Sequence, residues 1–232
     1  MRIAENLESV KGKINKSSLK AGRDPEAVKL VAVTKTVGLP EIIEAAQAGV
    51  SIFGENRVQE AKEKISNFKR QMSNSKLQWH LIGSLQKNKA SNAVRLFDLI
   101  HSVDSISLAE GINRQAHGVG KEQHVLIQVK LSDEAAKHGV LEKDLMELLK
   151  EVNKMSNLRL EGLMTIPPFF DDPEMTRPYF RKLREIRENL SEKGYNVPEL
   201  SMGMSNDFEV AIEEGATIVR IGTAIFGERT RK

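Results

Sequence analysis

Short apolar runs alternate with amphipathic segments along the whole chain. Each run has the length and β-branched content of a buried strand, and each is followed by a segment whose apolar residues recur with helical spacing. The runs span residues 29–35, 50–56, 77–83, 99–105, 124–131, 158–166, 199–205 and 217–223. Alternating strands and helices are typical of a parallel sheet, and eight such units in 232 residues match a closed barrel better than an open doubly wound sheet. We therefore predict an α/β fold, a single (β/α)8 TIM-type barrel; an open sheet is the alternative, because periodicity does not establish closure.

The N-terminal segment 1–22 lies outside this alternation. Its apolar residues recur with helical spacing: Ile3, Leu7, Val10 and Ile14. We predict an extra N-terminal helix that packs on the barrel. The clearest amphipathic helix inside the alternation is predicted over residues 140–155. No linker or low-complexity tract interrupts the chain, so residues 1–232 are predicted to form one domain.

Composition excludes several classes of protein. The chain has no cysteine, which rules out disulfides and thiolate metal sites, and its five histidines show no metal-binding spacing. The 35 basic and 32 acidic residues are interleaved without a basic block, so no nucleic-acid binding is predicted. The N-terminus lacks the apolar core of a signal peptide, and no apolar run approaches the roughly 18 residues of a membrane span. A cytoplasmic location without membrane contact follows as the expectation.

The stretch LVAVTK, residues 30–35, ends an apolar strand with a lysine. Lys35 either marks the point where the strand reaches the surface or is an amine kept in a pocket for chemistry, because a buried ammonium is costly without a partner. By the two-residue period of a strand, Lys35 shares a face with Val31 and Val33. If that face points into the barrel, the amine emerges at the C-terminal mouth, where such barrels have their active sites.

The last two strands carry small polar residues. Phosphate sites in these barrels commonly form from the loops after strands seven and eight. Candidate phosphate ligands there are Ser201, Ser205, Gly222 and Thr223. Taken alone, these residues are better explained by packing and turns. Together with a pocket lysine, they indicate a Schiff base between that lysine and a phosphorylated aldehyde, and desolvation favours the neutral amine that this chemistry needs.

Two further polar residues lie in the predicted strands. Arg220 either pairs with a carboxylate, for which Glu55 and Asp104 are candidates, or donates to an acceptor atom of a ligand. His80 is interpreted first as a hydrogen-bonded core histidine and second as a ligand-contacting residue.

Seven motifs, in order, resemble the pyridoxal phosphate homeostasis protein family, whose members are similar to the N-terminal barrel of alanine racemase. The motifs are AVTK (32–35), FGENRVQE (53–60), WHLIGSLQKNK (79–89), HSVDS (101–105), GLMTIPP (162–168), SMGMSNDFEVAI (201–212) and VRIGTAIFGER (219–229). They cover nearly the whole chain.

This resemblance implies a cofactor and a set of residues that bind it. Pyridoxal 5′-phosphate (PLP) is expected to be held covalently, as a Schiff base on Lys35, with Arg220 beside the pyridine nitrogen. The phosphate is expected on Ser201, Ser205, Gly222 and Thr223. The cofactor is expected to be lined by Asn56, His80 and Met164.

The resemblance also implies a role in intracellular PLP homeostasis without robust enzymatic activity. An arginine at the pyridine nitrogen disfavours a second positive charge there and leaves the electron sink weak. Racemisation needs an acid/base group on each face of the substrate. In alanine racemase one such group is a tyrosine from a second domain and a partner subunit, and no second domain is expected in a chain that ends at Lys232. The two tyrosines, Tyr179 and Tyr195, lie away from the predicted strand ends.

Two other functions stay open from sequence. One is a PLP-dependent enzyme such as a weak amino-acid racemase, and the other is a barrel aldolase that forms a Schiff base without a cofactor. The expected partners are PLP and, as transient clients, apo forms of PLP-dependent enzymes. A monomer is expected, because no exposed apolar stripe is present in the sequence.

Overall fold

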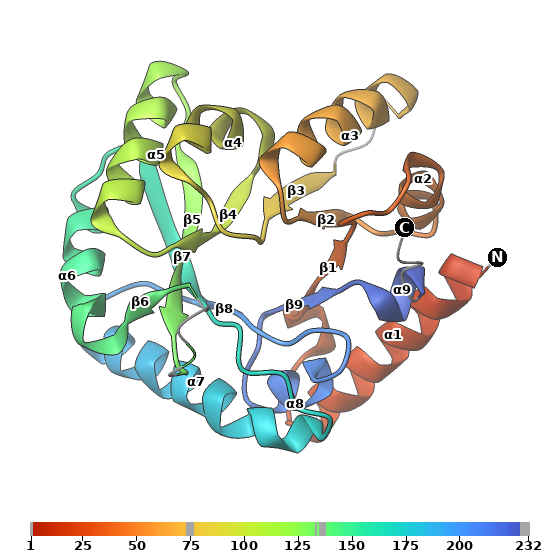
Figure 1. Ribbon diagram of the computed structural model, residues 1–232. Coiled ribbons are helices and arrows are strands. Elements are labelled where there is room, and N and C mark those ends of the chain that lie inside the picture. The colour runs from red at the N-terminus through yellow and green to blue at the C-terminus, as the bar shows by residue number, and fades with distance from the viewer. Residues whose placement is uncertain (1, 73–76, 133, 135–137, 228–232) are drawn as a thin grey trace.

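Parallel strands close into a ring in the computed structural model, which describes residues 2–72, 77–132, 134 and 138–227 (Figure 1). The strands of the ring are β1 (Lys29–Val33), β2 (Ile52–Glu55), β3 (Gln78–Leu81), β4 (Leu99–Val103), β5 (Gln123–Lys130), β7 (Leu158–Met164), β8 (Glu199–Ser201) and β9 (Ile218–Ile221). Each strand pairs with the next, and β9 pairs in parallel with β1, with Leu30 opposite Val219. The predicted barrel is therefore confirmed, and the open sheet is excluded.

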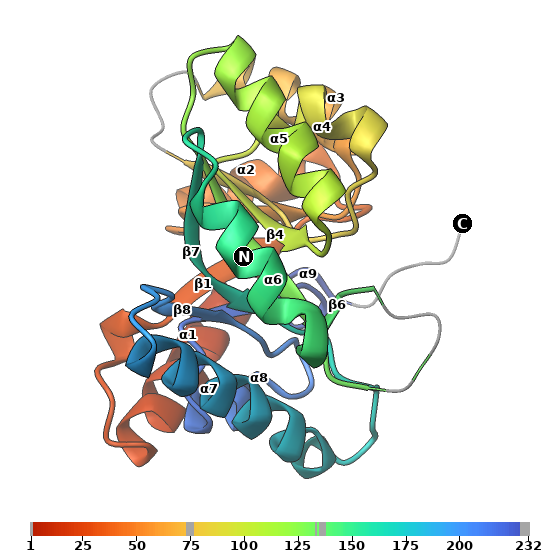
Figure 2. The same cartoon turned by 90° about the vertical axis from the view of Figure 1, so that its left-hand side faces the viewer.

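Helices surround the ring on its outer side (Figure 1). They are α2 (Leu39–Gln47), α3 (Val58–Gln71), α4 (Ala90–Leu96), α5 (Ile106–Gly118), α6 (Glu142–Asn153), α7 (Arg177–Glu192), α8 (Phe208–Glu213) and α9 (Thr223–Phe226), with short 3-10 turns η1 (Pro25–Ala27), η2 (Lys87–Lys89) and η3 (Pro173–Thr176). In Figure 2, α3, α4 and α5 lie on one side of the strands and α7 and α8 on the other, with α6 between them. Across the described ranges, no helix is both long enough and apolar enough to cross a bilayer.

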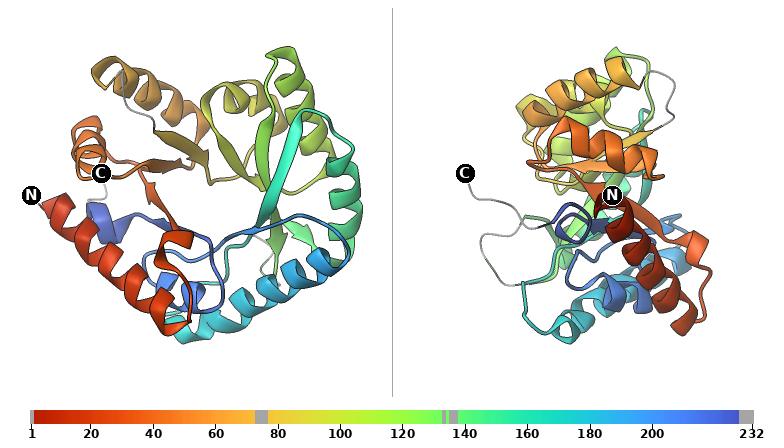
Figure 3. Two further views of the ribbon diagram at one scale, coloured as in Figure 1. Left: turned by 180° about the vertical axis from the view of Figure 1, so that it is seen from behind. Right: turned by 90° about the vertical axis from the view of Figure 1, so that its right-hand side faces the viewer.

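The predicted N-terminal helix is present as α1 (Arg2–Lys20) and packs on the barrel. It buries Ile3, Leu7, Val10 and Ile14 and contacts α8, α9 and α2. The Asn6 side chain donates a hydrogen bond of 2.9 Å to the carbonyl oxygen of Ile225. Figure 3 shows this red helix along the outside of the ring, beside the blue C-terminal elements. The helix thus supports the end of the barrel where the first and last strands meet.

The strands separate two apolar clusters. Alternate residues point into the barrel, where Val31 and Val33 pack with Leu126, Met164 and Ile218. The intervening residues face the helices; Ala32, for example, belongs to the larger outer cluster. This alternation confirms that the face shared by Val31 and Val33 is the interior one.

Two predicted elements differ from the structure. The helix predicted over 140–155 begins only at Glu142, because β6 (Val140–Leu141) first pairs with the end of β5. The strand predicted over 199–205 ends at Ser201. Beyond it, Gly203 adopts a φ of +91°, and a Cβ there would lie 2.6 Å from Cβ of Ala211. The chain therefore turns at Gly203 toward α8 instead of extending the strand. Part of the last motif (228–229) and the basic tail (230–232) lie outside the described residues.

The backbones of β7 and β8 approach closely at Gly162, and this contact predicts that a larger residue there lowers stability. A Cβ on Gly162 would lie 2.0 Å from the carbonyl oxygen of Glu199, a backbone atom that cannot move without disturbing the barrel. We expect Gly162→Ala to lower the free energy of unfolding by about 1–3 kcal/mol, measured by urea denaturation. The matched control is Gly12→Ala in α1, where no atom lies within 4 Å and better helix propensity should stabilise the protein by up to about 1 kcal/mol. Equal effects of the two substitutions would contradict this account.

Candidate functional site

A cavity of about 350 Å³ lies at the C-terminal mouth of the barrel, between the loops that follow β1, β2, β3, β7, β8 and β9. Its size falls in the range of small-molecule sites. It brings together these residues predicted from sequence: Lys35, Asn56, Ser205, Arg220, Gly222 and Thr223. The remaining lining is Val33, Ile82, Ile166, Pro168, Phe169, Phe170, Met204, Asn206 and Asp207. The cavity is therefore apolar on the side of the 166–170 loop and polar along β9.

Lys35 follows the interior face of β1 into this cavity. The strand ends at Val33, and Lys35 lines the cavity two residues later on the same face, half-buried. Within the described ranges, its amine makes no hydrogen bond or ion pair. An amine without a partner in a partly apolar pocket is available to a ligand.

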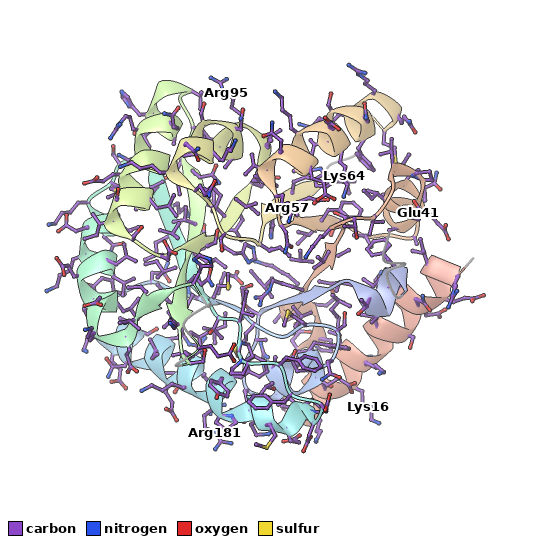
Figure 4. The ribbon with its side chains drawn as sticks, viewed as in Figure 1. Lys16, Glu41, Arg57, Lys64, Arg95 and Arg181 are labelled. Carbon is purple, nitrogen blue, oxygen red and sulfur yellow. The ribbon has the colours of Figure 1, made fainter. Side chains whose placement is uncertain are left out.

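The peptide groups that flank Lys35 are held by a partly buried ionic cluster. Lys64 of α3 donates to the Thr34 carbonyl oxygen (2.5 Å) and to the carboxylates of Glu55 (2.9 Å) and Glu60 (2.6 Å). Glu60 in turn accepts the backbone N–H of Thr36 at 2.8 Å. Figure 4 labels Lys64 on α3, near the strands of the ring. We call Glu55, Glu60 and Lys64 the lysine clamp.

The lysine clamp stabilises an unusual backbone. Thr36 has a φ of +62°, a left-handed conformation that costs a β-branched residue roughly 1–3 kcal/mol. Burial raises the pKa of Glu55, although hydrogen bonds from Lys64 and Thr34 oppose the shift. For Glu60, burial is outweighed by hydrogen bonds from Lys64 and Thr36, which lower the pKa. The clamp therefore fixes the turn that directs Lys35 into the cavity.

Arg220 contributes a buried positive charge to the cavity. Its residue is 3% exposed, and it donates to Ser201 Oγ (2.6 Å) and to the Thr165 carbonyl oxygen (3.0 Å). Neither carboxylate considered from sequence is its partner: Glu55 pairs with Lys64, and Arg220 has no ion pair in the described part of the chain. Burial lowers the pKa of Arg220 to about 10, with the charge of Asp207 acting in the opposite direction. The guanidinium thus stays charged at neutral pH.

Three predicted site residues lie deeper in the barrel and do not line the cavity. Ser201 is fully buried and accepts from Arg220, and Met164 belongs to the interior apolar cluster. His80 is 3% exposed and its Nδ1 lies 3.1 Å from Nε2 of His101. These side chains are one layer below the cavity, so in this structure they reach it only through residues such as Arg220.

Backbone N–H groups converge on a polar corner of the cavity. Those of Gly222 and Ala224 both point at Ser205 Oγ, at 3.2 and 3.4 Å. A Cβ on Gly222 would lie 3.4 Å from Val33, so the glycine lets β9 end close against β1. Ser205 Oγ accepts a hydrogen bond from each of these N–H groups, and a phosphate oxygen is also a hydrogen-bond acceptor. The corner therefore fits the predicted phosphate group through Ser205, Gly222 and Thr223.

Sequence reasoning missed several residues that shape the site. His101 was quoted in a motif but given no role, although it points inward with Leu99 by the two-residue period. Asp207 lines the cavity and accepts the Met204 N–H at 2.6 Å. The acidic residue at a predicted helix start was the available signal for it. Nothing in the sequence pattern places Phe169 and Phe170 over the cavity.

The family model "Alanine racemase, N-terminal domain" matches residues 3–230. The alanine racemase of Clostridium difficile 630 superposes with a TM-score of 0.71 at 18% identity, covering 99% of this chain and 60% of that chain, a likeness that supports the fold alone. The barrel with its lysine at the mouth thus defines a protein of the alanine racemase N-terminal domain class.

Relatives with higher sequence identity have names that refer to pyridoxal phosphate. The pyridoxal phosphate homeostasis protein of Aquifex aeolicus is 47% identical over 232 residues, covering 99% of each chain, and that of Escherichia coli K12 is 41% identical over 229 residues, covering 98% of this chain and 97% of the other. The structure of PipY from Synechococcus elongatus with PLP bound has a TM-score of 0.84 at 38% identity, covering 97% of this chain and 100% of that one. The chain belongs to the pyridoxal phosphate homeostasis protein family.

The lysine clamp predicts a pH-dependent loss of stability. Lys64→Met leaves the buried Glu55 carboxylate without its cation, and we expect the free energy of unfolding to fall by about 3–5 kcal/mol at neutral pH. Because a carboxyl with a raised pKa binds its proton more tightly when folded, the deficit should be small near pH 4 and grow as the pH rises. Urea denaturation across this pH range measures it.

The control is Lys62→Met, an exposed position on the same helix. It should change stability by no more than about 0.5 kcal/mol at any pH. A deficit in Lys64→Met that does not depend on pH would show that the protonation of Glu55 is not its cause.

Proposed function

We propose that this chain binds PLP through a Schiff base on Lys35 and serves as a carrier that helps to regulate the supply of this cofactor. One observation carries the proposal: a single cavity brings together the Lys35 amine, which has no hydrogen bond or ion pair among the described residues, the Gly222 turn and the buried Arg220 guanidinium. That arrangement matches a ligand with an aldehyde, a phosphate and a ring nitrogen that accepts a hydrogen bond. The PLP-bound structure of PipY supports it by relationship.

The covalent step involves only the lysine and the aldehyde. The amine nitrogen of Lys35 forms a C=N bond to the aldehyde carbon, and the aldehyde oxygen leaves as one water molecule. The unpartnered state of the amine favours this step, since no hydrogen bond has to be broken first. PLP supplies an electrophilic carbonyl and an electron sink when it is bound. The phosphate is assigned to Ser205, Gly222 and Thr223, and the side chain of Asn56 lines the cavity beside the lysine.

The composition of the cavity argues against efficient catalysis. Racemisation needs two acid/base groups, one on each face of the substrate. The ionisable residues of the cavity are Lys35, Asp207 and Arg220, and the last of these keeps its proton at neutral pH. No tyrosine is among the described residues that line it, and Tyr179 stacks behind Phe170 with a centroid distance of 6.1 Å. A carrier role needs no such pair.

The cavity mouth is suited to exchange. Phe169 lines the cavity and is 76% exposed, so a bound ring lies close to the surface. Release to apo forms of PLP-dependent enzymes is the proposed use of this opening.

Reduction with borohydride tests the covalent link. Purified protein loaded with PLP should show an absorbance band of the lysine-bound cofactor, and reduction should fix the cofactor to the peptide that contains Lys35, identified by mass. Lys35→Ala should lose both the band and the fixed adduct. The control Lys16→Ala, on the outer face of α1 (Figure 4), should retain both. A colourless wild-type protein, or an adduct on another lysine, would overturn the proposal; a colourless protein that borohydride links at Lys35 to a carbonyl substrate other than PLP would favour an aldolase.

Turnover is the second test. We expect the PLP-loaded protein to interconvert L- and D-alanine no faster than the Lys35→Ala variant, because no tyrosine is among the described residues of the cavity and the Asp207 carboxylate is already held by the Met204 N–H. Chiral chromatography of the reaction mixture measures this. Sustained racemisation by the wild type that is lost in Lys35→Ala would assign the chain to the weak racemases instead.

A further inference from the structure

A chain of hydrogen bonds crosses the barrel interior below the cofactor cavity. Arg220 Nη1 lies 2.6 Å from Ser201 Oγ, which lies 2.8 Å from His101 Nδ1. His101 Nε2 lies 3.1 Å from His80 Nδ1. The residues come from β9, β8, β4 and β3, on both sides of the ring, and each is at least 97% buried. We call these four residues the interior relay.

The hydrogen-bond directions in the relay follow from its arginine end and from the need to pair a buried hydroxyl. A guanidinium has no acceptor, so Arg220 must donate to the Ser201 oxygen. Among the described residues, His101 Nδ1 is the acceptor within reach of the Ser201 hydroxyl hydrogen, so the arrangement that leaves this buried hydroxyl paired has no proton on His101 Nδ1. His101 therefore carries its proton on Nε2 and donates it to His80 Nδ1. The remaining proton of His80 lies on Nε2.

The relay works only while both histidines are neutral. A proton on His101 Nδ1 would leave the Ser201 hydroxyl hydrogen without an acceptor among the described residues, and a doubly protonated ring would place a second positive charge near Arg220. Burial, together with neighbouring His80 and Arg220, lowers the pKa of His101 well below its usual range, and burial with a contribution from Lys29 lowers that of His80 to about 3. Both rings are thus neutral at physiological pH.

The other end of the relay reaches the opposite end of the barrel. His80 also lines a second cavity, of about 460 Å³, which lies among residues at the beginnings of strands, including Lys29, Gln78 and Leu99. The groups facing His80 from that cavity are Lys29, Asp98, Lys121, Glu122, His124, Glu161 and Glu199. No described residue bonds to His80 Nε2. The relay therefore links the cofactor cavity to a second, polar cavity through the core.

We propose that His101 and His80 are positioning residues for the cofactor site: through Ser201 they hold the Arg220 guanidinium at the floor of the cavity in a fixed orientation. The inference rests on the proposed PLP function, since it gives the orientation of Arg220 its purpose at the ring nitrogen. Arg220 forms no ion pair with a described carboxylate, and the Thr165 carbonyl oxygen is its one other acceptor among the described residues. His101 Nδ1 gives the Ser201 hydroxyl hydrogen an acceptor, and this second hydrogen bond fixes the orientation of the hydroxyl that accepts from Arg220.

A purely structural role is the competing explanation, and it makes different predictions. If the histidines only fill the core, their replacement should lower stability and leave the bound cofactor unchanged. If they position Arg220, the environment of the pyridine nitrogen changes, and with it the absorbance band of the lysine-bound cofactor and the pH at which that band titrates.

The test compares His101→Leu, which removes the acceptor for Ser201, with His101→Asn, which keeps a polar group near the position of Nδ1. For PLP-loaded full-length protein, we expect His101→Leu to raise the dissociation constant for PLP roughly tenfold or more and to shift the band and its pH titration. His101→Asn should lie closer to wild type. Ser201→Ala, which removes the link itself, should reproduce the spectral shift if His101→Leu does not fold.

Gln123→Leu is the matched control, because Gln123 is a fully buried polar residue of β5 outside the relay. It should leave the absorbance band and its titration as in wild type, whatever its effect on stability. A wild-type spectrum and affinity in either His101→Leu or Ser201→Ala would overturn the inference and leave the proposed function intact. A wild-type protein that takes up no PLP would instead overturn the proposed function and the inference with it.

Discussion

The pairing of the last strand with the first is the constraint on which the rest of the structure depends. β9 lies parallel to β1 in a register that sets Val31 opposite Arg220. Continuing that register brings the ends of both strands to one point, where Lys35 and the Gly222 turn line the same cavity. Closure of the barrel leaves its strands without unpaired edges, and it also has a consequence for the site. It joins residues nearly 190 positions apart into one site, while α1 covers the outside of the same seam.

A barrel interior that holds charged and polar groups has to compensate for their desolvation. Arg220 is buried with neutral acceptors and forms no ion pair in the described chain. Its hydrogen bonds to Ser201 Oγ (2.6 Å) and to the Thr165 carbonyl oxygen (3.0 Å) offset part of the cost of removing the guanidinium from water. The lysine clamp solves the same problem differently: Glu55 is fully buried but contacts the Lys64 ammonium. Both polar networks lie beneath the mouth of the barrel. Polar groups there can orient a ligand by hydrogen bonds, which apolar side chains cannot do.

Local periodicity predicted the parts of this site that depend on one strand at a time. The phase of Val31 and Val33 was enough to direct Lys35 inward, and the glycine and hydroxyl pattern after β9 was enough to indicate an anion corner. Local periodicity does not predict the distances between side chains on different strands of the barrel. The contact between His101 and Ser201 joins residues 100 positions apart and depends on barrel tilt and register. The same limitation explains why the sequence did not show that Ser201 and His80 are buried and absent from the lining of the cavity; their contact with the cofactor stays a prediction. Val140 was predicted to be helical because the apolar pattern at the start of a helix does not differ from that of a short strand.

Under the proposed function, the lysine clamp and the interior relay support opposite ends of the cofactor cavity. The clamp holds the backbone on both sides of Lys35, from β2 and α3, and the relay holds Arg220, from β3, β4 and β8. They share no residue. Under the proposed function, the covalent attachment of the cofactor and the electronic environment of its ring are therefore set by separate parts of the barrel. Substitutions in one network can change the strength of attachment without changing the ring environment, which is the physical requirement for a protein that must hold a reactive cofactor, keep it weakly activated and still release it.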